Sequence, residues 1–90
     1  MQNSIERAYQ DFANAIIKKA VDDYRRALDG KGYGGMSADR VIRDVERFFR
    51  SQYFEALTEV DGEFLITKLR QEHEEKERRK YESTLGASNI

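Results

Sequence analysis

The sequence contains no cysteine, no proline and no tryptophan. Without cysteine the chain has no disulfide, no thiolate zinc site and no thiol nucleophile. A metal site would have to be built from oxygen ligands and the single histidine, His73. Without proline, no helix is interrupted by a residue that lacks a backbone N–H. These absences exclude several classes of enzyme and metalloprotein before any pattern is considered.

Long apolar runs and an excess of one charge are also absent. No apolar run approaches the roughly 18 to 20 residues that span a membrane, and the N-terminus does not resemble a signal peptide. Lys and Arg number 16 and Asp and Glu number 17, for a net charge of −1. This balance favours neither nucleic acid nor an anionic membrane as a partner. We therefore expect one small soluble, cytoplasmic domain that does not associate with membranes.

The apolar residues recur every three or four positions, which predicts helices. The first helix should begin at Asn3 or Ser4, run for nearly 25 residues and end at Gly30 as its C-cap. Because an amphipathic helix buries its apolar stripe, we expect this stripe to face the core. The stripe consists of Ile5, Tyr9, Phe12, Ile16, Ala20, Tyr24 and Ala27, widened by Ile17, Val21 and Leu28.

Glycines and capping residues divide the rest of the chain. Residues 29–36, DGKGYGGM, hold four glycines and should form the main loop, without regular structure. Ser37, Ser51 and Asp61 are predicted N-caps of a second helix, a short third helix after a bend, and a fourth helix. The residues expected to face the core are Val41, Ile42, Val45, Phe48 and Phe49 from the second helix, and Phe64, Leu65, Ile66 and Leu69 from the fourth.

The apolar periodicity stops after Leu69, where the sequence becomes almost entirely charged. Three acid–base pairs at a spacing of four support a helix there. They are Glu72 with Lys76, Glu74 with Arg78, and Glu75 with Arg79. We predict an all-α fold, a small bundle of three to four helices with a compact core over residues 4–69. A charged helical extension over 70–82 should project into solvent and complete a single domain over 1–82, followed by a flexible tail over 83–90.

Four arginines form the best-defined polar pattern. Arg40, Arg43, Arg47 and Arg50 fall within an arc of about 80° on the second helix. Such a stripe can bind phosphates or the carboxylates of an acidic protein surface. It can also be an ordinary solvated face that Asp39, Asp44 and Glu46 neutralise. The aromatic corner formed by Phe48, Phe49, Tyr53 and Phe54 either packs within the chain or leaves ring surface exposed.

Other candidate sites are weaker. The glycine loop matches no phosphate-binding motif and is interpreted as a flexible connection, in which Tyr33 and Met36 can pack or contact a partner. His73 and Glu77 lie one helical turn apart, but on a solvated helix with no group to orient them, so we expect no metal. No serine has a neighbouring base. We therefore predict no cofactor and no catalytic residue, and place partner contacts at Arg40, Arg43, Arg47, Arg50, Tyr53 and Tyr33.

Residues 15–70 resemble a group of short proteins encoded by phages and prophages of Gram-positive bacteria. The most specific stretch is VERFFRSQYFEALTEVDGEFLITKL. Phage proteins of this kind include anti-CRISPR and other anti-defence inhibitors, as well as modulators of host replication and transcription. The resemblance by itself names no activity, but together with the lack of catalytic groups and the arginine stripe beside the aromatic corner it leads us to expect a non-enzymatic protein in the cytoplasm of the bacterial host cell. Its expected role is to bind and inhibit a host protein, for which a defence effector that handles nucleic acid is one candidate.

Two alternatives stay open. In the first, the protein is a nucleic-acid-binding accessory factor, whose arginine stripe and Lys18, Lys19 and Arg26 form one basic surface. In the second, it is a homodimeric structural protein whose corner aromatics pack across a two-fold axis.

Overall fold

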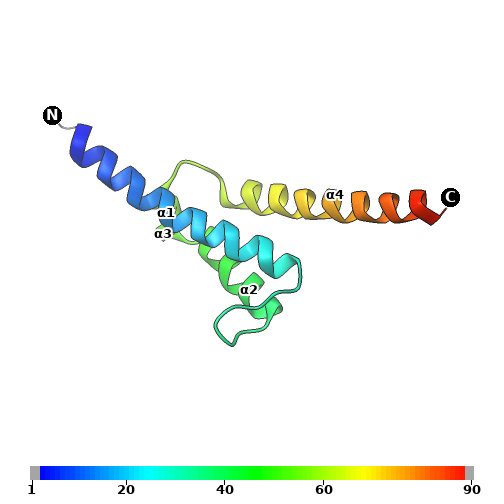
Figure 1. The fold of residues 1–90 in the computed structure, drawn as a ribbon. Coiled ribbons are helices and arrows are strands. Elements are labelled where there is room, and N and C mark those ends of the chain that lie inside the picture. Colours follow the sequence, from blue (N-terminus) through cyan, green and yellow to red (C-terminus); the bar gives the residue numbers. More distant parts are fainter. Residues whose placement is uncertain (1–2, 89–90) are drawn as a thin grey trace.

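The computed structural model describes residues 3–88, with side chains over 4–84, and these residues form four α-helices. The helices are α1 (Asn3–Leu28), α2 (Ala38–Phe49), α3 (Gln52–Leu57) and α4 (Gly62–Ser88). The predicted all-α class with a long first helix is confirmed. The N-terminal half of α1 and the C-terminal half of α4 extend in opposite directions from a central body that contains α2 and α3 (Figure 1). None of the described helices is both long enough and apolar enough to span a lipid bilayer.

Local capping sets the predicted helix starts. Side-chain oxygens of Ser37, Ser51 and Asp61 accept hydrogen bonds from backbone N–H groups two or three residues further on, at 3.2, 3.1 and 2.9 Å. These bonds satisfy donors that a helix leaves unpaired in its first turn, so all three predicted caps are confirmed. The cap predicted at Asn3 involves a side chain outside the described residues.

The glycine loop is more ordered than the sequence predicts. Gly30 (φ 89°) ends α1 as expected, and its N–H bonds to the carbonyl three residues before it at 2.9 Å. Tyr33 and Met36 then exchange two backbone hydrogen bonds of 3.1 and 2.9 Å around Gly34 (φ 58°) and Gly35 (φ 81°). Two consecutive residues of positive φ make a tight hairpin turn that side chains other than glycine disfavour. The prediction that this loop lacks regular structure is therefore wrong at residues 33–36.

The core lies where the four helices meet. Tyr24, Phe49, Phe54, Ile66 and Leu69 form one buried cluster. The ring of Phe49 packs edge-on against Tyr24, at 5.9 Å between centroids, and against Phe54, at 5.4 Å. Edge-to-face pairs at these distances are favourable contacts of aromatic rings. A single aromatic cluster thus holds together helices that are far apart in the sequence.

Gly62 sets how closely α4 approaches α2. A Cβ atom built on Gly62 would lie 1.9 Å from the carbonyl oxygen of Phe49, which is far inside van der Waals contact. Only glycine allows this approach, since the obstacle is backbone and has no rotamer to change. The contact places the start of α4 directly against the end of α2.

Part of the predicted core is exposed. Ile5, Tyr9 and Phe12 have exposed fractions of 66%, 73% and 64%, so the prediction that they face the core is wrong. The reason is the placement of the other helices: α2 and α3 have only 12 and 6 residues and cover the later part of α1, which has 26. The fourth helix, α4, extends away from the N-terminal half of α1 (Figure 1). The N-terminal turns of α1 therefore carry an apolar stripe that no other described helix covers.

Phe64 is also exposed, at 57%, which contradicts the prediction that it faces the core. With about 100° between successive residues of a helix, Phe64 points roughly 150° away from the direction shared by Leu65, Ile66 and Leu69. Four apolar residues within six positions cannot all lie on one face of a helix. Burial of the other three leaves Phe64 on the solvent side.

The charged part of α4 does not project into solvent along its whole length. Arg25 of α1 donates to both carboxylate oxygens of Glu72, at 2.9 and 3.1 Å, and Lys76 donates to Asp29 at 3.3 Å. The prediction that 70–82 projects is therefore wrong for its first half, which lies along the end of α1. The C-terminal half of the helix does extend away from the body (Figure 1).

The ion pairs within α4 also differ from the prediction, because the first half of the charged segment lies along the end of α1. Glu75 and Arg79 form the expected pair at 2.9 Å. Glu72 instead pairs with Arg25 of α1, and Lys76 pairs with Asp29, directly after α1. The helix also continues through Ser88, so the predicted helix end at residue 82 is wrong. No proline interrupts the backbone hydrogen bonds of this segment, and a helix that has formed propagates readily.

Candidate functional site

The arginine stripe of α2 divides into paired and unpaired members. Arg50 forms an ion pair with Glu63 of α4 and a second, at 3.3 Å, with Glu46. Arg40 lies 3.9 Å from Asp44. The side chains of Arg43 and Arg47 are exposed and have no hydrogen-bond or ion-pair partner among residues 4–84. Two adjacent guanidinium groups of the predicted four are thus available to an outside anion.

Glu46 lies at the junction of three helices. It accepts hydrogen bonds from Tyr24 Oη at 2.7 Å and from Arg70 at 2.6 Å, in addition to the contact with Arg50. Burial would raise the pKa of Glu46, but the hydrogen bonds from Tyr24 and Arg70 and the charges of Arg70 and Arg50 outweigh it and lower the pKa. Burial and the hydrogen bond to Glu46 raise the pKa of Tyr24. Arg50 therefore belongs to a network that joins helices.

Tyr33 and Tyr53 lie together on a different surface. Both are partly exposed and line an open groove of about 450 Å³ between α1 and α2, with Ile16, Met36 and Phe48 on its walls. The ammonium group of Lys19 lies 4.3 Å from the centre of the Tyr33 ring. The side of α2 that faces this groove is roughly 130° from the centre of the arginine stripe. The structure thus separates the two tyrosines from Arg43 and Arg47.

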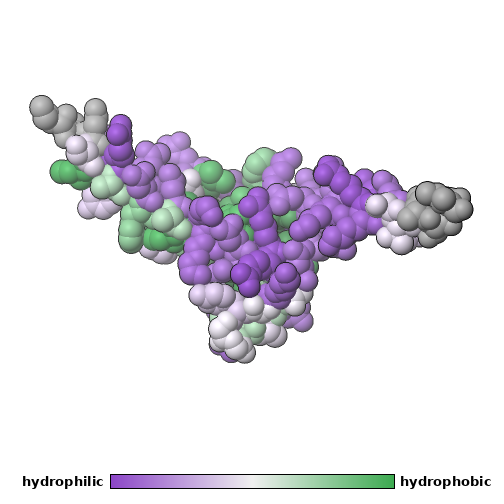
Figure 2. Space-filling model, in the orientation of Figure 1, coloured by the Kyte–Doolittle hydropathy of each residue, from purple (hydrophilic) through white to green (hydrophobic). Residues whose placement is uncertain are grey.

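The groove continues into the uncovered stripe of α1. Ile16 belongs to the groove, and Ile5, Tyr9 and Phe12 precede it at spacings of four, three and four residues, which keep one side of a helix. We call this combined surface the apolar face. It consists of Ile5, Tyr9, Phe12, Ile16, Tyr33, Met36, Phe48 and Tyr53. Figure 2 shows hydrophobic residues gathered over the N-terminal half of α1, in contrast to the hydrophilic surface of α4.

The sequence pattern predicts Tyr33 and Tyr53 as partner contacts but places the α1 members of the apolar face in the core. The signal that could have found them was already present in the sequence. The second and third helices are at most half as long as the first, and the apolar periodicity of the fourth ends at Leu69, so part of the stripe had to stay uncovered. Of the four aromatic residues at the helix corner, Phe49 and Phe54 are buried and Tyr53 is the most exposed.

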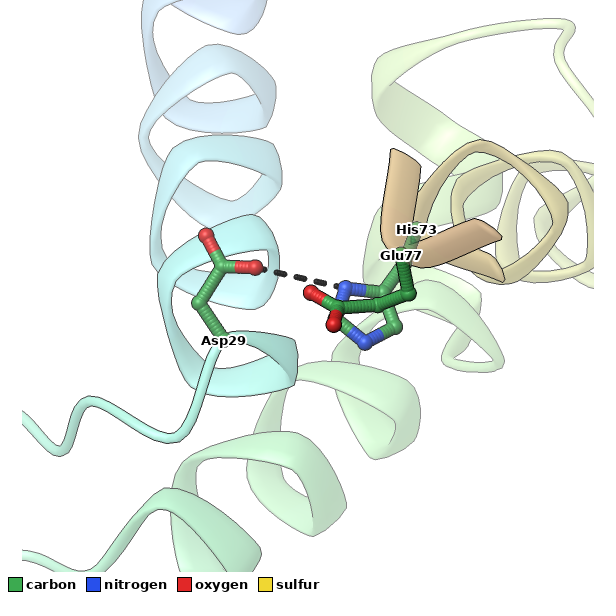
Figure 3. Close-up of side chains that lie close together, drawn as sticks. All are labelled: Asp29, His73 and Glu77. Atoms are coloured by element: carbon green, nitrogen blue, oxygen red, sulfur yellow. Dashed lines mark ion pairs between the residues drawn. The ribbon is translucent and has the colours of Figure 1, made fainter. Parts of the chain in front are cut away.

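A polar cluster lies at the contact between α1 and α4. Asp29 directly follows α1, and His73 and Glu77 occupy successive turns of α4 (Figure 3). His73 Nδ1 lies 3.3 Å from Asp29 Oδ1, and one side-chain ligand atom from each of the three residues lies within 4.8 Å of the other two. The hydrogen bond from Lys76, together with nearby positive charge, lowers the pKa of Asp29. Sequence spacing paired His73 with Glu77 but could not find Asp29, which only tertiary packing brings near.

Comparison with protein-family models, with curated proteins and with solved structures finds no match. The phage resemblance of residues 15–70 therefore stays a prediction, and the functional interpretation depends on the surfaces described above.

Proposed function

We propose that this chain is a non-enzymatic binding protein of phage or prophage origin that inhibits a host protein in the bacterial cytoplasm. The binding surface in this proposal is the apolar face. The origin and the class of target, anti-CRISPR and other anti-defence inhibition among them, rest on the sequence resemblance alone. The location of the surface rests on its geometry.

The exposure of Ile5, Tyr9 and Phe12 carries the proposal. Three large apolar side chains, each more than 60% exposed, lie on one side of a helix. Helices in proteins gain most of their stability by packing an apolar face, and the first turns of α1 pack little of theirs. A partner groove that accepts this face would supply the missing burial, as in other complexes where a helix binds in a groove.

The composition of the apolar face also favours a protein partner. Tyr9, Phe12, Tyr33 and Tyr53 are aromatic, and aromatic residues are enriched at the centres of protein interfaces. Charged residues border the groove, with Lys19 and Asp23 on α1 and Asp44 on α2. An apolar centre with a polar rim is the usual anatomy of a specific interface. Arg43 and Arg47 lie outside this face and are assigned no role in the main proposal.

Affinity capture from a Gram-positive host lysate tests the proposal. The lysate is treated with nuclease, and the captured proteins are identified by mass spectrometry. The test variant is Tyr9→Gln with Phe12→Gln. The matched control is Tyr81→Gln, which removes an equally exposed aromatic ring from α4, far from the apolar face. We expect one stoichiometric host protein that the wild type and the control retain and the double variant loses, and that the purified chain inhibits in its own assay.

Two outcomes would contradict the proposal. Capture of the same protein by the double variant would place the binding surface elsewhere. Light scattering that shows a dimer of the wild type and a monomer of the double variant would assign the apolar face to a second copy of the chain. In that case no host protein would be needed to cover it.

A second candidate function is nucleic-acid binding, which the unpaired guanidinium groups of Arg43 and Arg47 favour. An electrophoretic shift assay at low and high salt tests it, since neutralised phosphates make affinity fall steeply with salt. The variant Arg43→Ala with Arg47→Ala should lose binding. The variant Arg7→Ala with Arg78→Ala makes the same change in net charge at other exposed positions and should retain it. Absence of a shift for the wild type at low salt removes this candidate.

A further inference from the structure

We propose that Asp29, His73 and Glu77 form a binding site for a divalent transition-metal ion, of which Zn²⁺ is the best match, and that the ion links α1 to α4. This inference is independent of the proposed function, because the site lies at the contact between α1 and α4 and shares no residue with the apolar face.

The geometry of the first pair fits a small tetrahedral ion. Zn²⁺ binds nitrogen and oxygen ligands at about 2.0–2.2 Å, so two ligands in a tetrahedral site lie roughly 3.3–3.6 Å apart. The observed distance from His73 Nδ1 to Asp29 Oδ1 is 3.3 Å. The carboxylate of Glu77 lies beside the imidazole ring (Figure 3), with all three ligand atoms within 4.8 Å of one another. Binding of the ion requires the three ligand atoms to approach one another more closely than this limit, and the side chain of Glu77 is exposed and can change rotamer to do so.

The backbone holds one ligand directly after the end of α1 and the other two on α4. The N–H of Asp29 bonds to the carbonyls of Arg25 and Arg26 at 3.2 and 3.1 Å, so Asp29 is fixed to the last turn of α1. His73 and Glu77 are four residues apart on α4, which places them on the same side of that helix. The carboxyl end of α1 also carries the partial negative charge of the helix dipole, which favours a cation there.

The donor set selects the class of metal. One imidazole nitrogen and two carboxylates suit Zn²⁺ and the neighbouring transition metals. Ca²⁺ and Mg²⁺ prefer six or more oxygen ligands, which this site does not offer. Three protein ligands leave the fourth tetrahedral position to water. Lys76 pairs with Asp29 at 3.3 Å and Lys80 with Glu77 at 3.5 Å, so the ion competes with two ammonium groups for these carboxylates.

Besides core packing and ion pairs, a metal ion at this site would connect α1 to α4. Their contact otherwise involves Leu69 in the core and ion pairs such as that between Arg25 and Glu72. A ligand that binds only the folded state stabilises it by mass action. Bound Zn²⁺ should therefore raise the unfolding temperature and hold the charged part of α4 against the body.

Calorimetric titration of Zn²⁺ into the full chain, without any polyhistidine tag, tests the site. We expect binding at a ratio of one ion per chain. Each of Asp29→Asn, His73→Ala and Glu77→Gln should weaken it at least about tenfold. Glu74→Gln, at an exposed acidic position on the same helix, is the matched control and should bind as the wild type does. Far-UV circular dichroism of each variant checks that the helices are retained.

A second readout identifies the ligand atom. His73 is the only histidine, so two-bond proton–nitrogen NMR spectra contain one imidazole. Zn²⁺ should shift Nδ1, the nitrogen that faces Asp29, more than Nε2. The proposal is overturned if the wild type binds no Zn²⁺ at a ratio of one, if His73→Ala binds as tightly as the wild type, or if Glu74→Gln weakens binding as much as the ligand variants do.

Discussion

Tyr24 of α1 and Glu46 of α2 are joined by a hydrogen bond of 2.7 Å, and Arg70 of α4 binds the same carboxylate oxygen at 2.6 Å. Tyr24 is fully buried, so its hydroxyl group has no access to water. Glu46 thus connects three helices through one side chain. The polar connection lies beside the aromatic cluster, where Tyr24 also contacts Phe49.

Tyr24→Phe should lower the free energy of unfolding by about 1–2 kcal/mol, because it removes one hydrogen bond to a charged group and keeps the ring. Urea denaturation followed by circular dichroism measures the change. Tyr81→Phe is the control, since Tyr81 is exposed on α4 and its loss of a hydroxyl group should change stability by less than about 0.5 kcal/mol. Equal stability of the wild type and Tyr24→Phe would show that the bond to Glu46 contributes nothing.

Stability should fall as the pH falls through the acid range, and Glu46 should contribute to this loss. Its pKa in the folded protein is below the ordinary value of 4.5. A carboxylate with a lowered pKa adds stability above its unfolded pKa and loses that contribution as the pH falls through its folded pKa. The wild type should therefore be more stable than Glu46→Gln at pH 7, and the difference should shrink below about pH 4.5. Denaturation of both proteins across this range provides the measurement, and a difference that grows in acid would contradict the assignment.

Gly62→Ala should destabilise the protein by about 1–3 kcal/mol, even though alanine favours helices more than glycine does. The added Cβ would meet the carbonyl oxygen of Phe49 at 1.9 Å, so α4 has to move away from α2. Thermal unfolding of this variant is compared with that of Thr67→Ala, at an exposed position of α4. A rise in unfolding temperature for Gly62→Ala would mean that the close approach is not required.

Phe12 and Phe49 should respond very differently to truncation. Phe49 is 1% exposed, and Phe49→Ala should lower the free energy of unfolding by about 3–5 kcal/mol. This is a large fraction of the total stability of a small domain. Phe12→Ala should change the stability of the isolated chain by less than about 0.5 kcal/mol, since its ring is already in contact with water. Chemical denaturation at low protein concentration distinguishes the two. A large loss for Phe12→Ala would show that the N-terminal turns of α1 are covered in solution.

Local signals predicted the helices well because they depend on neighbours in the chain. The hydroxyl groups of Ser37 and Ser51 cap the helices that they precede, and the carboxylate of Asp61 does the same, through bonds that span only two or three residues. Gly30 ends α1 for an equally local reason, its positive φ. The hairpin turn at Gly34 and Gly35 was missed, although its two adjacent glycines are a turn signal of the same local kind.

The candidate sites were predicted only in part because each depends on distant contacts. The spacing of Arg40, Arg43, Arg47 and Arg50 predicts a stripe. Arg50 differs from the other members because it forms an ion pair with Glu63, which lies in another helix. Tyr33 and Tyr53 were selected one by one, and their common groove arises only when α1 packs against α2.

The sequence by itself determined an all-helical chain, its helix starts, its loop and the residue types available for binding, because caps, periodicity and composition act over a few residues. Tertiary structure alone decided which apolar residues stay exposed, since that depends on where the shorter helices end along α1. It also brought Asp29 beside His73 and assembled Tyr24, Glu46 and Arg70. Such contacts join residues many positions apart, and no local pattern in the chain encodes the distance between them.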